Sequence, residues 1–231
     1  MRVERTLRTV LLCVGVLMVA MSAGCGEPPP PVDTSLLTGE PCEPPCWQGL
    51  TPGESTEEDV AEFMKATRFV DTRSVRRGSY TRLTLSGEEV TGVIIYWRSS
   101  GGLSPCNDFS IEEGVLTDLT ICPYPGVTLG RLIDRYGPPE KYVSHLSGYE
   151  RQWVDVTLYY PTHGFTVYLM LRPDDATLKP ESKVVSIWYF RAAPLERFLQ
   201  LGWEAGYFSS VPAGAEEFGH DWQGYGRVPL G

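Results

Sequence analysis

The chain has 231 residues, of which 42% are hydrophobic and 11% aromatic, and its formal net charge at pH 7 is -9. The aromatic content argues against a disordered chain, and 24 Gly with 19 Pro argue against a simple helical bundle. The negative charge disfavours a nucleic-acid partner, because binding phosphates requires a basic surface.

Residues 1–24 have the pattern of an export signal, with three arginines before an apolar run that is shorter than the roughly 20 residues of a membrane span. Ser22-Ala23-Gly24-Cys25 follows and resembles the lipobox of bacterial lipoproteins. The resemblance implies cleavage before Cys25 and a diacylglycerol on its sulfur, with a further acyl chain such as palmitate on its amino group. Two or more chains anchor a protein stably in a lipid bilayer. A plain secretory signal is the alternative.

A Pro-rich segment follows the lipobox. Residues 25–45 contain four consecutive prolines and three more near the end, a composition that favours extended polyproline II. We therefore predict a tether that holds the folded part of the chain away from the bilayer. Removal of residues 1–24 takes away three arginines and one glutamate, so the net charge of the mature chain becomes -11.

Four further cysteines remain in the mature chain, and exported thiols usually oxidise to disulfides. Cys106 and Cys122 lie at equal distances from Gly114, the turn glycine of a predicted hairpin, so the two arms would bring them into disulfide range. Cys42 and Cys46 would then pair by elimination. A zinc site is the less favoured alternative, since no histidine lies nearby in sequence, and we predict no metal site.

The body of the chain contains an internal repeat at a spacing of 72–73 residues. Residues 80–85 align with 153–158, and residues 92–97 align with 164–169. We predict two units, 46–122 and 123–191, each with one helix followed by four antiparallel strands. The predicted fold is therefore α+β, with the sheets separate or joined into one curved sheet. An aromatic, Gly-rich C-terminal tail completes the chain at 192–231.

The predicted elements follow in chain order. In the first unit, Ser55 and Glu58 form a capping box for a helix, and strands follow near 68–75, 79–86, 91–98 and 106–122, the last a hairpin. In the second unit, Thr128 caps a helix that Gly137 ends, and strands follow near 140–146, 151–160, 164–172 and 183–190. A short helix is predicted over 194–201.

The second predicted helix is framed by Gly126-Val127-Thr128, Leu132-Ile133 and Tyr136-Gly137-Pro138-Pro139. This pattern resembles the residues that begin and end the helix in the β-lactamase inhibitory protein-like fold and in the small outer-membrane assembly lipoproteins that share it. The resemblance covers about residues 46–191 and implies a concave sheet that binds proteins. The stretch 45–53 is also similar to that of uncharacterised exported bacterial lipoproteins, which implies no activity.

The two faces of the predicted sheet differ in an informative way. One face should pack on the helices, and its residues are Leu83, Leu85, Val93, Ile95, Val154, Val156, Leu158, Val167, Leu169, Val185 and Ile187. The other face, usually polar, is aromatic, and its candidate binding residues are Trp153, Tyr159, Tyr168, Met170 and Trp188. Such a face has two explanations. It is a binding platform, or the C-terminal tail folds back and buries it, which is the commoner use of aromatic side chains.

No catalytic pattern emerges from the chain. His145, His163 and His220 are not spaced as metal ligands, and the sequence has no nucleophile elbow or phosphate-binding loop. We therefore expect a protein that is not an enzyme and needs no cofactor, anchored through Cys25 on the extracytoplasmic side of a membrane in the cell envelope. Its expected partner is an envelope or extracellular protein. A glycan- or small-molecule-binding module that uses the aromatic face is the alternative.

Overall fold

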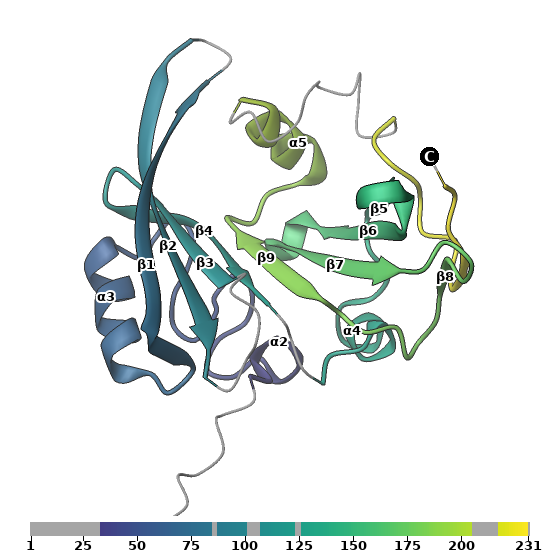
Figure 1. The fold of residues 1–231 in the computed structure, drawn as a ribbon, viewed down its shortest axis with the longest axis horizontal. Coiled ribbons are helices and arrows are strands. Elements are labelled where there is room, and N and C mark those ends of the chain that lie inside the picture. The colour runs from purple at the N-terminus through teal and green to yellow at the C-terminus, as the bar shows by residue number, and fades with distance from the viewer. Residues whose placement is uncertain (1–32, 85–86, 101–106, 123–125, 205–216, 231) are drawn as a thin grey trace, which may run out of the picture.

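The computed structural model describes residues 33–84, 87–100, 107–122, 126–204 and 217–230. An eight-stranded antiparallel sheet runs through it in the order β1-β2-β3-β4-β9-β7-β6-β5 (Figure 1). The α+β class and the antiparallel pairing predicted from the sequence are confirmed. The strands of the large sheet are β1 (Val70–Leu83), β2 (Glu89–Ser99), β3 (Asn107–Glu112), β4 (Val115–Ile121), β5 (Lys141–Ser147), β6 (Trp153–Tyr160), β7 (Phe165–Leu171) and β9 (Ser186–Phe190).

Helices lie on both faces of this sheet. The main helices are α2 (Ser35–Thr38), α3 (Glu57–Ala66), α4 (Leu129–Tyr136) and α5 (Leu195–Glu204), and η1 (Tyr149–Arg151) and η2 (Pro161–His163) are single 3-10 turns. A second small sheet pairs β8 (Thr177–Leu178) with β10 (Gly226–Arg227). Among the described residues, no helix has the length and apolar character needed to span a bilayer.

The helix caps differ by one residue from the prediction in the first unit. The Thr56 hydroxyl accepts the Asp59 N–H at 3.2 Å, and the Asp59 carboxylate accepts the Thr56 N–H at 2.7 Å, so the capping box uses these two residues. Ser55 is buried, and its hydroxyl accepts the Thr51 N–H at 2.9 Å. In the second unit Thr128 caps α4 as predicted, and the predicted C-terminal helix is α5.

The two predicted strands 68–75 and 79–86 are one long strand, β1. Its register against β2 shifts between Asp71 and Arg76. The irregularity interrupts the alternation of residues along the strand, so the sequence pattern wrongly indicated two strands. The predicted hairpin 106–122 is confirmed as β3 and β4, with Gly114 at a φ of 78° in the turn.

The order of elements is the same in both halves of the large sheet. Helix α3 precedes β1, β2, β3 and β4, helix α4 precedes β5, β6, β7 and β9, and the halves meet where β4 pairs with β9. By position in the sheet, β2 corresponds to β6 and β3 to β7. The spacing of 72–73 residues instead aligns the end of β1 with β6 and β2 with β7. That alignment therefore matches strands that hold different positions in the sheet.

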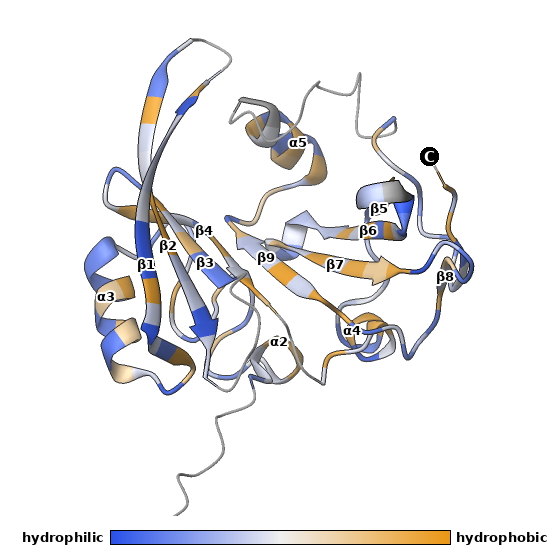
Figure 2. Cartoon of the chain, viewed as in Figure 1, coloured by the Kyte–Doolittle hydropathy of each residue, from blue (hydrophilic) through white to orange (hydrophobic). Residues whose placement is uncertain are grey.

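The main core fills the space between α2, α3 and α4 and one face of the sheet, which we call the core face. Figure 2 shows hydrophobic residues concentrated on the central strands β7 and β9. Most of the predicted core residues are confirmed as buried: Ile95, Val154, Val156, Leu158, Val167, Leu169 and Ile187. Val93 and Val185 are half-buried, and Leu85 lies outside the described residues. Leu83 was wrongly predicted, since it is 67% exposed on a hairpin that extends past the end of β3.

The folded part of the chain begins before the predicted end of the tether at residue 45. The Asp33 carboxylate accepts hydrogen bonds from the Trp47 indole N–H at 2.5 Å and from the Gln48 amide at 3.0 Å. Leu36 is 1% exposed within the main core. The predicted disulfide between Cys42 and Cys46 is confirmed. Residues 33–45 are therefore packed against the body, because short local contacts and a closed ring replace the extended form that their prolines suggested.

A buried and an exposed leucine together test the packing of residues 33–45. Replacing Leu36 with Ala should lower the free energy of unfolding by about 2–5 kcal/mol, as for other buried leucines. Replacing the exposed Leu83 with Ala should change it by no more than about 0.5 kcal/mol. Urea unfolding of the two variants measures both values, and equal small effects would contradict a packed N-terminal segment.

Candidate functional site

One row of side chains crosses all eight strands on the face opposite the core face. We call this face the α5 face, because α5 packs against it. The pairing register sets the order of the row: Arg76, Tyr96, Asp108, Thr120, Trp188, Thr166, Tyr159 and Lys141. Alternation along each strand puts the predicted binding residues Trp153, Tyr168 and Met170 on this face too. The sequence therefore correctly predicted that the five residues share one face, although the core face also carries aromatic residues, among them Trp97, Phe109 and Phe165.

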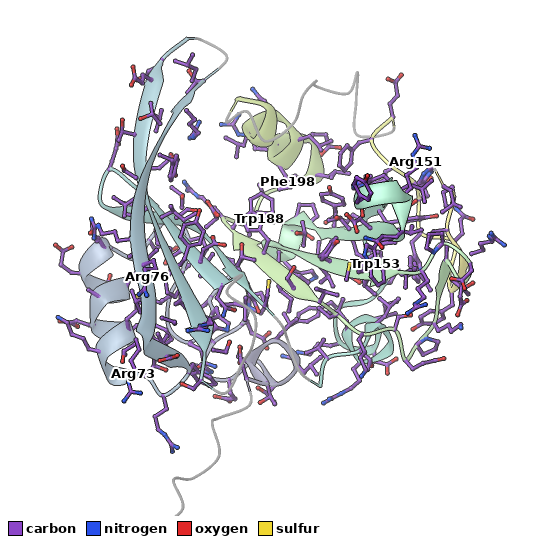
Figure 3. The ribbon with its side chains drawn as sticks, viewed as in Figure 1. Arg73, Arg76, Arg151, Trp153, Trp188 and Phe198 are labelled. Carbon is purple, nitrogen blue, oxygen red and sulfur yellow. A yellow bond between two sulfur atoms is a disulfide. The ribbon has the colours of Figure 1, made fainter. Side chains whose placement is uncertain are left out.

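The C-terminal segment covers the centre of the α5 face. The Phe198 ring on α5 lies 6.3 Å from the Trp188 ring and 5.9 Å from the Tyr159 ring (Figure 3). Phe218 approaches Tyr159 to 4.9 Å, and burial raises the pKa of Tyr159 to about 12. Phe190 stacks on Phe198 at 4.6 Å. These rings form a second, smaller hydrophobic cluster on this side of the sheet.

The remaining predicted binding residues lie apart from this cluster. Trp153 is half-buried at the start of β6, at the other end of that strand from Tyr159 (Figure 3). The Tyr168 hydroxyl donates to an Asp155 carboxylate oxygen at 2.5 Å, and burial together with this bond raises the pKa of Tyr168. Met170 is 41% exposed. The five predicted residues thus share a face, but only Tyr159 and Trp188 come together.

A groove opens beside the α5 cluster, above the junction of the two halves of the sheet. Its volume is about 200 Å³. Strands β1, β3, β4 and β9 and helix α5 supply its lining, which consists of Arg82, Glu112, Thr117, Asp118, Trp188, Phe190, Arg191, Phe198, Leu201 and Gly202. Of the five predicted binding residues, only Trp188 lines the groove.

A β-bulge directs two consecutive residues of β4 into this groove. Ser110 lies opposite Asp118, whereas Ile111 lies opposite Leu116, so Thr117 is an extra residue in β4. The Thr117 hydroxyl donates to the Ser110 carbonyl at 3.1 Å and to the Asp118 carboxylate at 3.0 Å. The spacing of the buried Leu116 and Leu119 breaks strict alternation, and this was the sequence signal for the bulge.

The polar wall of the groove is a hydrogen-bonded set around Glu112. The Arg82 guanidinium makes two parallel bonds to the Glu112 carboxylate, each 2.9 Å long, and the Tyr80 hydroxyl donates to the same carboxylate at 2.9 Å. The Tyr80 ring lies over Gly92, where a Cβ atom would come within 2.4 Å of the ring. Burial and the Glu112 carboxylate raise the pKa of Tyr80.

Two carboxyl groups lie near the seam between β4 and β9. The Trp188 indole N–H donates to the Asp118 carboxylate at 3.0 Å. Asp108 lies on β3, opposite Thr120 of β4. Burial and the charge of Asp118 raise the pKa of Asp108 to about 7, although a hydrogen bond from Thr120 acts in the opposite direction.

None of the three histidines lines the groove. His145 is exposed, with its Nε2 atom 3.7 Å from an Asp155 carboxylate oxygen, and His163 and His220 pack beside Tyr136 and Tyr142. The described residues contain no group of three or more potential metal ligands. With its apolar floor and paired charges, the groove is suited to recognising a ligand by contact and hydrogen bonding.

Two predicted features fall on residues that the structure leaves undescribed. Cys25 and the lipobox lie in the range 1–32, and Cys106 lies in the range 101–106. The disulfide between Cys106 and Cys122 therefore stays a prediction. Cys122 is buried, and Asp108 lies opposite Thr120 in the hairpin, which is the register on which that prediction depends.

Comparison with known proteins adds no family to this description. No protein-family model, no curated protein and no solved structure matches the chain.

The raised pKa of Asp108 predicts how stability depends on pH. The folded protein binds this proton more tightly than the unfolded chain, so the favourable contribution is complete below about pH 4 and is lost as the pH rises towards about 7. Asp108→Asn should therefore stabilise the protein more at pH 8 than at pH 5. Unfolding by urea at the two pH values measures the difference, with the exposed Asp174→Asn as control. The same change at both pH values would contradict the assignment.

Proposed function

We propose that this protein is an extracytoplasmic lipoprotein that binds a partner protein in the groove beside α5. The size and lining of the groove carry the proposal. At about 200 Å³ it is smaller than the roughly 300–1,000 Å³ of pockets that enclose a whole small-molecule ligand. It has room for one or two side chains of a partner. An aromatic floor with a charged rim is also the usual composition of the centre of a protein interface.

The groove differs from a neutral apolar slot in its charges. Arg82 and Glu112 are paired with each other at one wall, and Asp118 is bonded to Trp188 at the floor. These charges are held in place before a ligand arrives, so binding orders few additional side chains. Fixed polar groups around an aromatic floor give a partner both an anchor and an orientation.

The finer description of the fold is part of the same proposal. We infer that residues 46–122 and 123–191 are tandem units joined into one continuous curved sheet. The equal order of helix and strands in the two halves supports this inference, as does the single junction between β4 and β9. A curved sheet of this kind also agrees with the resemblance to protein-binding lipoproteins, which rests on the residues that flank α4.

The proposed lipid on Cys25 would orient the groove. From Cys25 to Asp33 the chain can extend at most about 29 Å, since a residue spans no more than about 3.6 Å. Helix α2, which begins two residues later, lies at the opposite end of the molecule from α5 (Figure 1). The anchor would hold the α2 end near the bilayer and present the groove towards the aqueous side.

A glycan-binding module is the second candidate. It is favoured by one observation, the position of the Arg82–Glu112 pair beside the Trp188 ring, because fixed polar groups next to an aromatic ring also orient sugars. Phe198 packs edge-on against the half-buried Trp188, so a sugar would have only part of that ring to stack on, and this favours the protein partner.

The groove can be tested with two exposed leucines. Leu201→Asp places a charge at the rim beside α5, whereas Leu230→Asp places the same charge at a similarly exposed position near the C-terminus. A partner cross-linked to the full-length protein in its own membranes and identified by mass spectrometry should be recovered at least tenfold less with Leu201→Asp, and equally with Leu230→Asp. Equal recovery with both variants would contradict binding of the partner in the groove. If Leu201→Asp instead abolished binding of a glycan, the second candidate would be supported.

The anchor has a separate test. Cys25→Ser removes the sulfur that the lipid would occupy, so the variant should leave the membrane fraction, and its mass should lack the acyl chains that the wild-type protein carries. Cell fractionation with intact mass spectrometry measures both. A variant that stays in the membrane fraction with an unchanged mass would contradict lipidation at this residue.

A further inference from the structure

The outer edge of β1 has backbone groups that no other described strand uses. β1 ends the sheet and pairs only with β2 among the described strands. The Thr84 N–H donates to the Glu88 carbonyl at 2.8 Å, which fixes the alternation of the ladder. By this alternation, Tyr80 and Arg82 bond to β2, and the N–H and C=O groups of the odd-numbered residues from Arg77 to Leu83 point away from it. These residues span about 20 Å of edge.

The upper part of this edge stands clear of the body. β3 ends opposite Gly92, so no other described strand pairs with the β1–β2 hairpin beyond that point. Figure 1 shows the hairpin rising past the rest of the sheet, and the Leu83 side chain on it is exposed. The Arg82–Glu112 pair and the Tyr80 hydroxyl tie its base to the end of β3. The edge is therefore both held in place and accessible.

The side chains along β1 are strongly basic on a chain of net negative charge. The strand contains Arg73, Arg76, Arg77 and Arg82 and one acidic residue, Asp71. Figure 2 shows hydrophilic residues along its lower part, and Figure 3 labels Arg73 and Arg76 there. Arg76 donates to the carbonyls of Arg73 and Val75 at 3.1 and 2.8 Å, which holds its charge at the bulge.

Glu112 holds Arg82 in a two-bond pair, whereas Arg73, Arg76 and Arg77 are exposed. Arg77 pairs with Glu57 but is 56% exposed, and exposed pairs of this kind bind weakly. Glu89 lies opposite Leu83 on β2, one strand away from the open edge. Arg73 is exposed and forms no side-chain bond among the described contacts. A segment that added to β1 would therefore meet the exposed Arg77, with Arg76 and Arg73 further along the strand.

We propose that the outer edge of β1 from Arg77 to Leu83 binds an extended, acidic segment of a partner protein by strand addition. Main-chain hydrogen bonds would supply affinity, and the exposed arginines at one end of the edge would favour a segment that carries Asp or Glu. A second copy of this chain fits less well, because edge arginines and a bulge oppose the pairing of like strands. The surface lies outside the groove lining except for Arg82, so the proposal goes beyond the proposed function.

The experiment uses the full-length protein as purified from cells and two synthetic probes. One probe is an eight-residue peptide that alternates Thr with Glu, and the other alternates Thr with Lys. Fluorescence anisotropy of labelled peptides should show binding of the Glu peptide and at least tenfold weaker binding of the Lys peptide. Amide hydrogen exchange should slow at residues 77, 79, 81 and 83 when the Glu peptide is bound, because strand addition protects the outward N–H groups.

Three variants test the geometry and the charge. Thr81→Pro removes an outward N–H that makes no bond to β2, so it should weaken the Glu peptide at least tenfold. Arg77→Glu should weaken it as well, whereas Arg151→Glu, an exposed arginine in the other half (Figure 3), should not. Hydrogen exchange of the β2 amides in the absence of peptide checks that each variant keeps the hairpin.

Other outcomes would overturn the proposal. These are equal binding of the two peptides, binding unchanged by both Thr81→Pro and Arg77→Glu, and a dimer in solution that slows exchange at the same four amides. Leu201→Asp should leave binding of the Glu peptide unchanged. A loss of binding with Leu201→Asp alone would place the peptide in the groove and overturn strand addition while supporting the proposed function.

Discussion

The short pairing of β4 with β9 is the constraint on which the rest of the structure depends. In the part of the chain that the structure describes, four residue pairs, from Asp118–Phe190 to Ile121–Ile187, join the two halves into one sheet. On the core face these strands place Leu119, Ile121 and Ile187 in a single core that extends under both halves. On the α5 face they bring Asp118 and Trp188 within hydrogen-bond distance. One junction therefore creates both the continuous core and the floor of the groove.

The groove combines a rigid floor with walls that come from distant parts of the chain. The bulge at Thr117 gives β4 two polar side chains on the groove side, and the Arg82–Glu112 pair connects the projecting hairpin to the end of β3. Helix α5 closes the other side with Phe198 and Leu201. Because strands carry all of these polar groups, their positions are set by backbone pairing, which is what pre-organised recognition requires.

Residue patterns predicted the faces of the sheet well and its contacts poorly. Alternation correctly separated Val154, Val156 and Leu158 from the aromatic face, since period-two patterning depends on each strand alone. The prediction that Leu83 is buried was wrong because burial there depends on where β3 ends, and no local sequence pattern indicates that end. The groove escaped prediction because Glu112, Asp118 and Phe198 meet only through the junction of the halves and the return of α5, which are both long-range. The sequence did not predict that the fold begins at Asp33, because the prolines around the disulfide ring suggested an extended tether.

The central claim is that the groove beside α5 contacts a partner protein on the aqueous side of a membrane. The most direct measurement places a photo-reactive phenylalanine analogue at position 201 in the full-length protein, with the same analogue at position 230 as the matched site, and irradiates intact cells. The account predicts one discrete protein adduct from position 201 that is absent from position 230 and that Trp188→Ala removes. Identical adducts from both positions, or an adduct from position 201 that Trp188→Ala leaves unchanged, would contradict it.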